Sequence, residues 1–206
     1  GLDWFGNKIV DYNIVIFPHK KPQANKKTFI GFEFTIIDER ITKLDKKIEN
    51  LEKNNVLILP GGGDLKKIGV EMAENLLKNF FNPHLVLGPT NETKIKNNNY
   101  KVSRNISNIS HAIKNANWMI TNGGGALFEA MCSGRPAYAM PTTKEEQRIV
   151  NFLLEKQALI DVSLNQVKNI KNKKWIKIKK NSTKIVDGKG LERICNIIQD
   201  KYHNKN

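Results

Sequence analysis

Two runs of three glycines are the positions in this sequence best suited to bind an anionic ligand. Residues 123–125 lie within ITNGGGALFEAM (residues 120–131), and residues 61–63 follow the apolar run NVLIL. Glycine lets a backbone approach ligand oxygens closely. Where such a loop leads into a helix, free N–H groups and the positive end of the helix dipole favour a phosphate. We therefore expect anion binding at both runs, and the alternative is a pair of ordinary tight turns.

One acid, Glu129, follows four residues after Gly125. A carboxylate there can accept two hydrogen bonds from the vicinal hydroxyls of a ribose while the glycines hold a diphosphate. The alternative is an acid that complements the helix dipole. The spacing matches neither the dinucleotide-binding pattern G-x-G-x-x-G nor the P-loop pattern, which disfavours NAD binding and ATP hydrolysis.

A second polar segment, PTTKEEQ, ends the next apolar run. Glu145, Glu146 and Gln147 open a helix there, at the same expected edge of a sheet. Their side chains either reach the hydroxyls of a sugar or form an ordinary acidic first turn of a helix.

From residue 55 onward, short apolar runs alternate with amphipathic runs and are joined by loops rich in Gly and Pro. This pattern predicts an α/β fold: a Rossmann-like, mostly parallel sheet with helices on both faces, whose ligands bind at the carboxyl ends of the strands. The expected strands are residues 55–59, 84–87, 100–104, 118–121, 137–140 and 159–162, and the expected helices are residues 64–79, 107–115, 125–133, 144–156 and 190–202.

The first part of the chain does not complete such a unit. Residues 12–17 and 28–38 read as extended, and residues 42–53 as a charged helix with Leu44, Ile48 and Leu51 on one face. We expect residues 1–41 to be the remnant of an N-terminal domain with its linker, and residues 42–206 to be the main domain. The sequence begins with Gly rather than Met, which suggests a piece of a longer chain.

The composition of the chain is that of a globular protein without a membrane helix. The chain has 206 residues, 39% of them apolar, and no apolar run near the roughly 20 residues of a membrane helix. No signal peptide is visible, and the two cysteines, Cys132 and Cys195, read as free thiols of a reducing cytoplasm. The four histidines are scattered, so we expect neither a metal nor a cofactor.

The net charge of +14 suits an anionic partner, and the lysines are densest in residues 167–184. One hypothesis is therefore a non-catalytic module that binds nucleic acid or a membrane surface through this segment. The alternative is a general Lys/Asn/Ile bias of the chain, and we do not expect DNA binding. Trp175 and its flanking lysines are interpreted as a solvated, partly amphipathic surface element.

Residues 106–147 resemble the nucleotide-sugar signature of the C-terminal domain of GT-B enzymes, within the glycosyltransferase family 28 group. That group includes the N-acetylglucosaminyltransferase that makes the lipid-linked peptidoglycan precursor. The resemblance is closer to the UDP-sugar hydrolase of pseudaminic acid biosynthesis. It rests on GFEFTIIDERI (31–41), LPGGGD (59–64) and VDGKGLERI (186–194).

The resemblance implies a UDP-sugar site without a metal. Gly124 and Gly125 would hold the diphosphate, and Glu129 would bind the ribose. The roles it implies for the other positions concern the diphosphate or sugar (Gly62, Gly63), the uracil edge, read by backbone (Ser107, Asn108, Ile109), and the ribose or sugar (Glu145, Gln147).

One part of the family pattern is missing. In these enzymes a glycine-rich loop of the N-terminal domain carries the catalytic base, a histidine in the hydrolase, and His19 in FPHKK does not match it. The catalytic residue is therefore unknown, and this chain alone is expected to bind nucleotide with little or no activity. Hydrolase and glycosyltransferase remain open, and so does contact with the inner membrane through residues 167–184.

Overall fold

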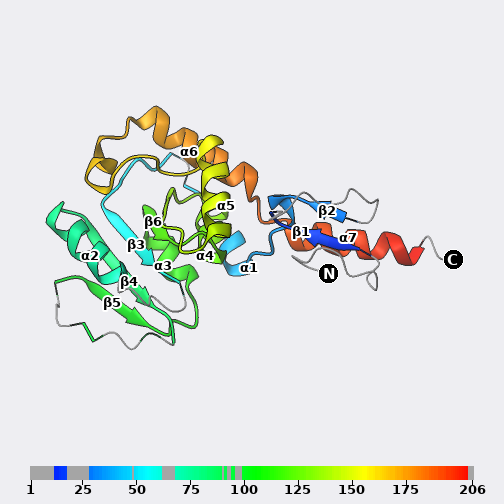
Figure 1. Cartoon of the computed structure of the whole chain (residues 1–206), viewed down its shortest axis with the longest axis horizontal. Coiled ribbons are helices and arrows are strands. Elements are labelled where there is room, and N and C mark those ends of the chain that lie inside the picture. Colours follow the sequence, from blue (N-terminus) through cyan, green and yellow to red (C-terminus); the bar gives the residue numbers. More distant parts are fainter. Residues whose placement is uncertain are drawn as a thin grey trace.

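The computed structural model describes residues 12–17, 28–47, 49–61, 68–89, 91, 94–95 and 99–203. Its centre is a parallel sheet with the strand order β5-β4-β3-β6-β7 (Figure 1). The strands are β3 (Asn55–Leu59), β4 (Asn82–Leu87), β5 (Lys101–Arg104), β6 (Trp118–Thr121) and β7 (Ala137–Ala139). The predicted α/β fold with a parallel sheet is confirmed. The strand order reverses beside β3, so the crevice between β3 and β6 is the switch point where such sheets bind ligands.

Helices cover both faces of this sheet. Strand β3 shows why, because Val56 and Ile58 join one apolar cluster while Leu57 and Leu59 join the other. The first cluster packs under α2 (Ile68–Lys78) and α6 (Asn172–Ile185). The second packs under α3 (Ser110–Asn115), α4 (Gly125–Cys132) and α5 (Lys144–Glu155).

The helix predicted at residues 42–53 is wrong. The chain has only the short α1 (Glu39–Thr42), and the described residues that follow form turns and loop. Lys47 takes a positive φ of 44°, which a right-handed helix does not allow.

Long-range hydrogen bonds explain this loop. The buried Arg135 side chain donates to the carbonyl of Asp45 at 2.8 Å. The buried Lys179 ammonium donates to the carbonyls of Lys47, at 2.8 Å, and Asn50. Two buried cations therefore fix the loop, because each loses its hydration and takes backbone oxygens in exchange.

Trp175 was also misread, because its side chain is fully buried in the apolar cluster under α2 and α6. The lysine-rich segment forms the 3-10 helix η2 (Leu164–Asn169) and then α6, whose inner face carries this tryptophan. The burial of one large aromatic side chain anchors an otherwise polar helix to the sheet.

The last expected strand, residues 159–162, is not a strand either. Leu159 and Ile160 are buried, and the Ile160 N–H donates to the carbonyl of Ala137 at 2.8 Å. The apolar run reflects burial beside β7 rather than membership of the sheet.

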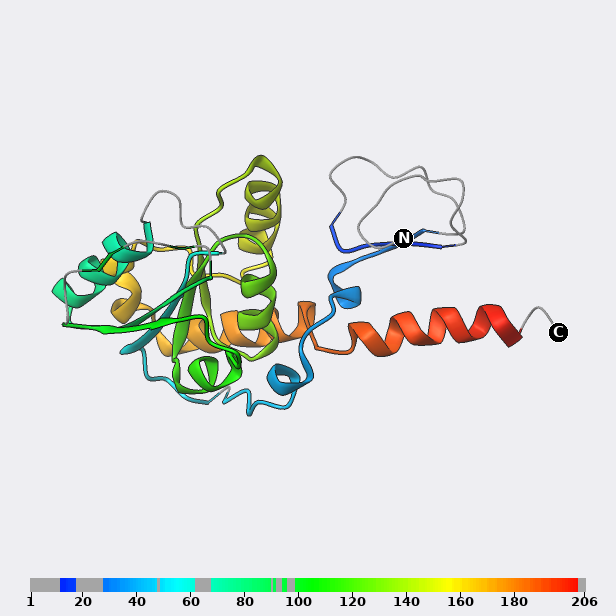
Figure 2. The ribbon, with the colours of Figure 1, turned by 90° about the horizontal axis from the view of Figure 1, so that it is seen from below.

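A second structural unit lies at one end of the molecule (Figures 1 and 2). A parallel pair, β1 (Asn13–Val15) and β2 (Thr28–Ile30), is followed by the 3-10 helix η1 (Phe32–Phe34), which contacts α7 (Gly190–His203). In the described part of the chain no helix combines the length and the apolar character needed to cross a membrane.

The contact between η1 and α7 brings together two motifs that are far apart in the sequence, residues 31–41 and 186–194. Arg193 forms an ion pair with Asp187 at 2.6 Å and donates to the carbonyl of Glu33 at 2.9 Å. This guanidinium lowers the pKa of Asp187 to about 2. A Cβ added to Gly190 would overlap the carbonyl oxygen of Thr35, so only glycine allows the first turn of α7 to approach so closely.

Gly190→Ala should therefore lower the free energy of unfolding by about 1–3 kcal/mol, because the added methyl meets rigid backbone. Urea denaturation measures this loss. Gly125→Ala is the matched control, since a Cβ there meets nothing within 4 Å, and its stability should change by about 0.5 kcal/mol or less. Equal stability of the Gly190 variant and the wild type would contradict the close approach.

Candidate functional site

Three loops leave the sheet at the same level and form the candidate site. Leu59, the last residue of β3, pairs with Thr121 of β6, and Thr121 pairs with Ala139 of β7. The chain after each of these residues therefore starts from one edge of the sheet, beside the switch point. Helices α4 and α5 begin just beyond two of these loops.

The first glycine loop begins beside the second. A Cβ placed on Gly61 would lie 3.2 Å from the amide nitrogen of Asn122, the residue that precedes the second glycine run. Gly62 and Gly63 lie outside the described residues, so their role at the diphosphate or sugar stays a prediction. Gly61 shows that their loop leaves the sheet next to residues 122–124.

A carboxylate connects the second glycine loop to the third. Glu146 accepts hydrogen bonds from the Asn122 amide at 2.8 Å and from the backbone N–H and hydroxyl of Thr142 at 2.7 and 2.8 Å. A Cβ on Gly123 would lie 2.6 Å from the Cβ of Glu146, so glycine is needed there to let α5 approach. Part of the glycine run thus serves packing within the protein rather than a ligand.

Gly125 is different, because its missing side chain faces open space. It is the first residue of α4, and Gly124 is the N-cap. The Gly124 N–H makes a long hydrogen bond of 3.4 Å to the Asn122 side chain. Among the described residues, no neighbouring side chain or backbone explains the glycine at position 125, which leaves room for a ligand at a helix N-terminus.

Glu129 lies in the second turn of α4, one turn beyond Gly125. It is half-buried, and within the described residues no hydrogen bond to its carboxylate is found. Burial raises the pKa of Glu129, and the nearby negative charge of Asp38 raises it further. A partly desolvated carboxylate without a donor is suited to accept hydrogen bonds from a ligand.

The segment predicted to read the base forms the turn into α3. The Asn108 side chain accepts from the N–H of Ser110 at 3.1 Å and from its hydroxyl at 2.6 Å. The helix accordingly begins at Ser110, three residues later than expected. Ser107 is exposed and Ile109 half-buried, and recognition of uracil by the backbone here stays a prediction.

Glu145 and Gln147 lie on either side of Glu146 in the first turn of α5, and both are exposed. The Gln147 amide donates to the side chain of Asn151 at 2.8 Å. The structure therefore brings Glu146, rather than these two predicted residues, into contact with the glycine loop. The role of Glu145 and Gln147 near a ribose or sugar stays a prediction.

Sequence reasoning thus missed the roles of Asn122 and Glu146. A local signal was present, because Thr143 and Glu146 have the spacing of a capping box, and the Thr143 hydroxyl does accept from the Glu146 N–H at 3.1 Å. The bond from Asn122 to Glu146 spans 24 residues and has no such signal.

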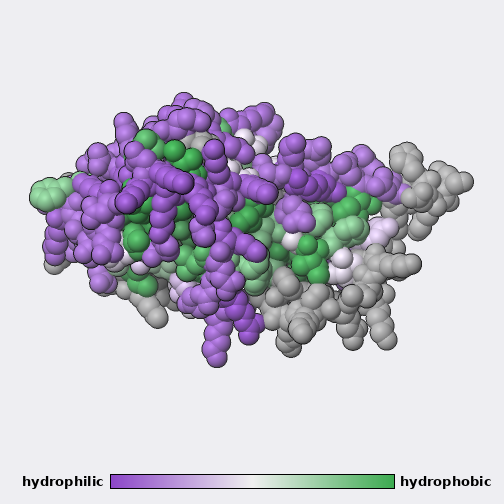
Figure 3. All heavy atoms as spheres, turned by 90° about the horizontal axis from the view of Figure 1, so that it is seen from above, coloured by the Kyte–Doolittle hydropathy of each residue, from purple (hydrophilic) through white to green (hydrophobic). Residues whose placement is uncertain are grey.

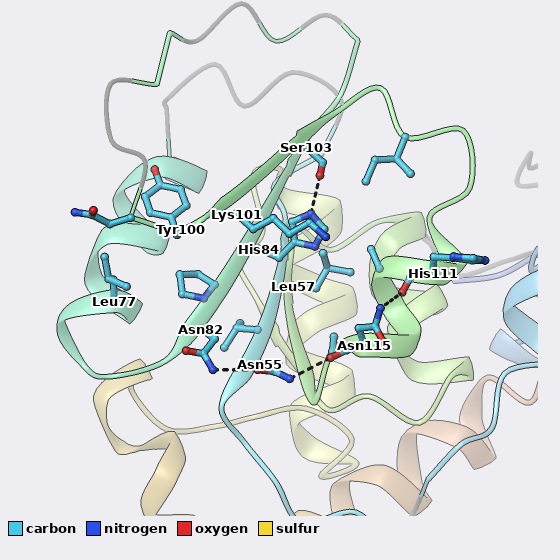
Figure 4. A pocket seen from close by; sticks show the side chains of 16 residues that line it. Asn55, Leu57, Leu77, Asn82, His84, Tyr100, Lys101, Ser103, His111 and Asn115 are labelled. Carbon is cyan, nitrogen blue, oxygen red and sulfur yellow. Dashed lines mark hydrogen bonds between the residues drawn. The ribbon is translucent and has the colours of Figure 1, made fainter.

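A separate cavity of about 450 Å³ lies on the sheet face beside α3 (Figure 4). It is lined by the first residues of β3, β4 and β5, and of the described glycine-loop residues neither Gly61 nor residues 123–125 line it. Among the lining residues, His84 and Ser103 lie on the neighbouring strands β4 and β5, with the imidazole Nε2 2.9 Å from the hydroxyl oxygen (Figure 4). Burial, and then the charge of Lys101, lowers the pKa of His84. This cavity is distinct from the candidate phosphate site.

No protein-family model matches the sequence. The chain is 27% identical over 144 residues to the uncharacterized protein MJ1062 of Methanocaldococcus jannaschii, covering 62% of this chain and 30% of that protein. It is 25% identical over 115 residues to the spore coat polysaccharide biosynthesis protein SpsG of Bacillus subtilis, covering 50% of this chain and 34% of SpsG. The chain thus spans about a third of the length of the curated relatives it matches.

Solved structures define the class of fold. MurG of Acinetobacter baumannii superposes with a TM-score of 0.64 at 14% identity, over 93% of this chain and 60% of MurG. The glycosyltransferase SsfS6 of Streptomyces sp. SF2575, complexed with thymidine diphosphate, gives a TM-score of 0.57 at 12% identity, over 92% of this chain and 52% of SsfS6. The protein has the α/β fold of GT-B glycosyltransferase domains.

Glu146→Gln should lower the free energy of unfolding by about 1–3 kcal/mol, because an amide cannot accept all three hydrogen bonds and its NH₂ would face other donors. Chemical denaturation tests this loss. The control Glu145→Gln changes an exposed neighbour and should alter stability by about 0.5 kcal/mol or less. Equal effects of the two substitutions would rule out the bridge between loops.

Glu129→Gln should have the opposite effect, raising the free energy of unfolding at neutral pH by about 0.5–1 kcal/mol because it removes a partly buried charge. A carboxyl whose pKa is raised in the folded state binds its proton more readily there than in the unfolded chain. Lowering the pH therefore stabilises the wild type through this group, and its difference from the variant should shrink toward about pH 4. Urea midpoints across this range measure the effect, and a pH-independent difference would refute it.

Proposed function

We propose that the chain binds the nucleotide of a UDP-sugar at the carboxyl edge of the sheet. The observation that carries this proposal is the combination at α4: an open side-chain position at Gly125 and, one turn later, the half-buried Glu129 carboxylate. Residues four apart on a helix lie on the same face, roughly 6 Å from each other. A diphosphate at the helix N-terminus and a ribose beside the acid can therefore be held by one helix.

The remaining contacts follow from the same placement. Backbone N–H groups of Gly124 and Gly125 bind the diphosphate, with residues 62–63 approaching from the β3 loop. Backbone at residues 107–109, which follow β5 on the same edge, reads the base. Hydrogen bonds from ribose hydroxyls favour the charged form of Glu129 and offset the burial that raises its pKa.

For the reaction, we infer hydrolysis of an amino-sugar nucleotide in surface-glycan synthesis. Water attacks the anomeric carbon, the bond to the diphosphate oxygen breaks, and UDP leaves with the bonding electrons. The N-terminus of α4 stabilises the negative charge that develops on the leaving group. A general base, not assigned to any residue of this chain, takes the proton from water.

A glycosyltransferase is the second candidate, because the solved structures with this fold include MurG and SsfS6. An acceptor hydroxyl then replaces water, and the nucleotide contacts stay the same. Release of UDP from a UDP-amino sugar without any acceptor supports the hydrolase, whereas release that requires an added acceptor supports the transferase. Because the general base is not assigned to any residue of this chain, these assays use the full-length protein.

Calorimetric titration tests the nucleotide site directly. We expect UDP to bind the wild type, and Glu129→Ala to weaken binding by about tenfold or more through loss of charge-assisted hydrogen bonds. Gly125→Ala should also weaken binding while leaving stability unchanged, because its methyl enters the open position. Glu155→Ala, an exposed acid at the far end of α5, is the control.

Parallel titrations with thymidine diphosphate, CMP and RNA define what is recognised. Binding of both diphosphates but not CMP identifies the diphosphate as the main contact, and a preference for UDP supports reading of the base. If UDP gave no heat at millimolar concentration, the proposed site would be wrong. RNA binding that survives Glu129→Ala would favour a polyanion-binding module.

A further inference from the structure

One exposed face of α6 consists of lysine alone. Lys173, Lys177, Lys180 and Lys184 follow one another at intervals of four, three and four residues, which places them in a single row along the helix. We call this row the lysine stripe. All four are exposed, whereas Trp175 on the opposite face is fully buried. The stripe spans twelve residues, residues 173–184, or roughly 16 Å of helix from the first lysine to the last.

Among the described residues, no acidic side chain forms an ion pair with the stripe. Helix α6 contains no acidic residue. The adjacent Lys174 is paired with Asp161, and in the described part of the chain no ion pair involves a lysine of the stripe. The view from above, from the side where α6 lies in Figure 1, shows hydrophilic side chains over most of this surface (Figure 3). A row of like charges without counter-charges favours an external anionic partner.

An exposed aromatic side chain lies in a turn that is bound by Lys168, five residues before the stripe begins. Phe80 is 86% exposed and takes a φ of 59°, a left-handed conformation that bulky residues adopt only at a cost. The Lys168 ammonium donates to the carbonyl of Phe80 at 2.8 Å, and Lys168 belongs to η2, which leads into α6. The neighbouring Phe81 is buried, so the turn presents one ring to the core and the other to solvent.

We propose that the lysine stripe and Phe80 form a docking surface for an anionic phospholipid membrane. Each lysine near such a surface contributes about 1 kcal/mol of attraction, and an exposed aromatic ring inserts at the headgroup level. A straight row of charge fits a planar anionic surface, and Phe80, held by Lys168 of the segment that leads into α6, supplies an exposed apolar side chain. A nucleic acid would instead be expected to meet charges that follow a curved backbone or groove. This inference is independent of the nucleotide site.

Flotation with lipid vesicles tests the proposal on the 206-residue chain. The wild type should float with phosphatidylcholine vesicles that contain about 30% phosphatidylglycerol and not with pure phosphatidylcholine. Raising the salt from about 0.1 M to about 0.5 M should release it. Replacing all four stripe lysines with Gln should lower the vesicle partition coefficient by at least about 30-fold.

A matched control removes the same charge elsewhere. Lys94, Lys101, Lys114 and Lys144 are exposed and lie outside α6, and their replacement with Gln should lower partitioning by about threefold or less. Phe80→Asn should weaken partitioning by about tenfold without reducing its salt dependence. Asn accepts the left-handed conformation more readily than Phe, so this variant should be at least as stable as the wild type.

Three results would overturn the proposal. The first is wild-type protein that stays unbound to the anionic vesicles. The second is equal loss of binding in the stripe and control variants, which would indicate a response to net charge alone. The third is an unchanged partition coefficient for Phe80→Asn. RNA binding that depends on the stripe, in protein that ignores the vesicles, would assign this face to nucleic acid instead.

Discussion

The common level at which β3, β6 and β7 end is the constraint on which the candidate site depends. Parallel pairing fixes this level through backbone hydrogen bonds, so three loops distant in sequence start side by side. Glu146 then fixes two of these loops relative to each other, because its carboxylate accepts hydrogen bonds from Asn122 of one loop and Thr142 of the next. Gly125, where an added Cβ meets none of the described atoms within 4 Å, lies two residues beyond the part of the loop that Glu146 fixes.

The glycines of residues 123–125 therefore have different surroundings, which the sequence alone does not distinguish. Gly123 allows α5 to pack against the loop, while Gly125 leaves an unoccupied position at the start of α4. Glu129 adds a carboxylate whose burial is costly in the absence of a partner. Packing within the protein thus requires a glycine at position 123 but not at position 125.

Much of the architecture could be predicted from local pattern. The apolar runs of the sheet strands and the helices α4, α5 and α7 appear close to their expected bounds, because burial on both faces of a parallel sheet leaves a clear signal.

The incorrect predictions concern segments whose structure depends on residues distant in the sequence. Residues 42–53 have the periodicity of a helix, but Arg135 and Lys179 hold that segment as a loop. Trp175 was misjudged because its neighbours in sequence are lysines, whereas its neighbours in space are apolar. For the candidate site, the sequence predicts the glycine runs and Glu129 as ligand-binding positions, and these roles stay predictions. The contact between Asn122 and Glu146 could not be predicted, because it joins two loops 24 residues apart.

The junction of η1 with α7 has a mechanical consequence. The chain crosses between the sheet and the β1–β2 pair twice, once after η1 and once before α7, and Arg193 holds these two crossings together. With two adjacent connections, the two units can rotate relative to each other only about the axis through both connections. A single linker would allow rotation in every direction. Gly190 lies at this connection, where the first turn of α7 packs against the backbone of Thr35.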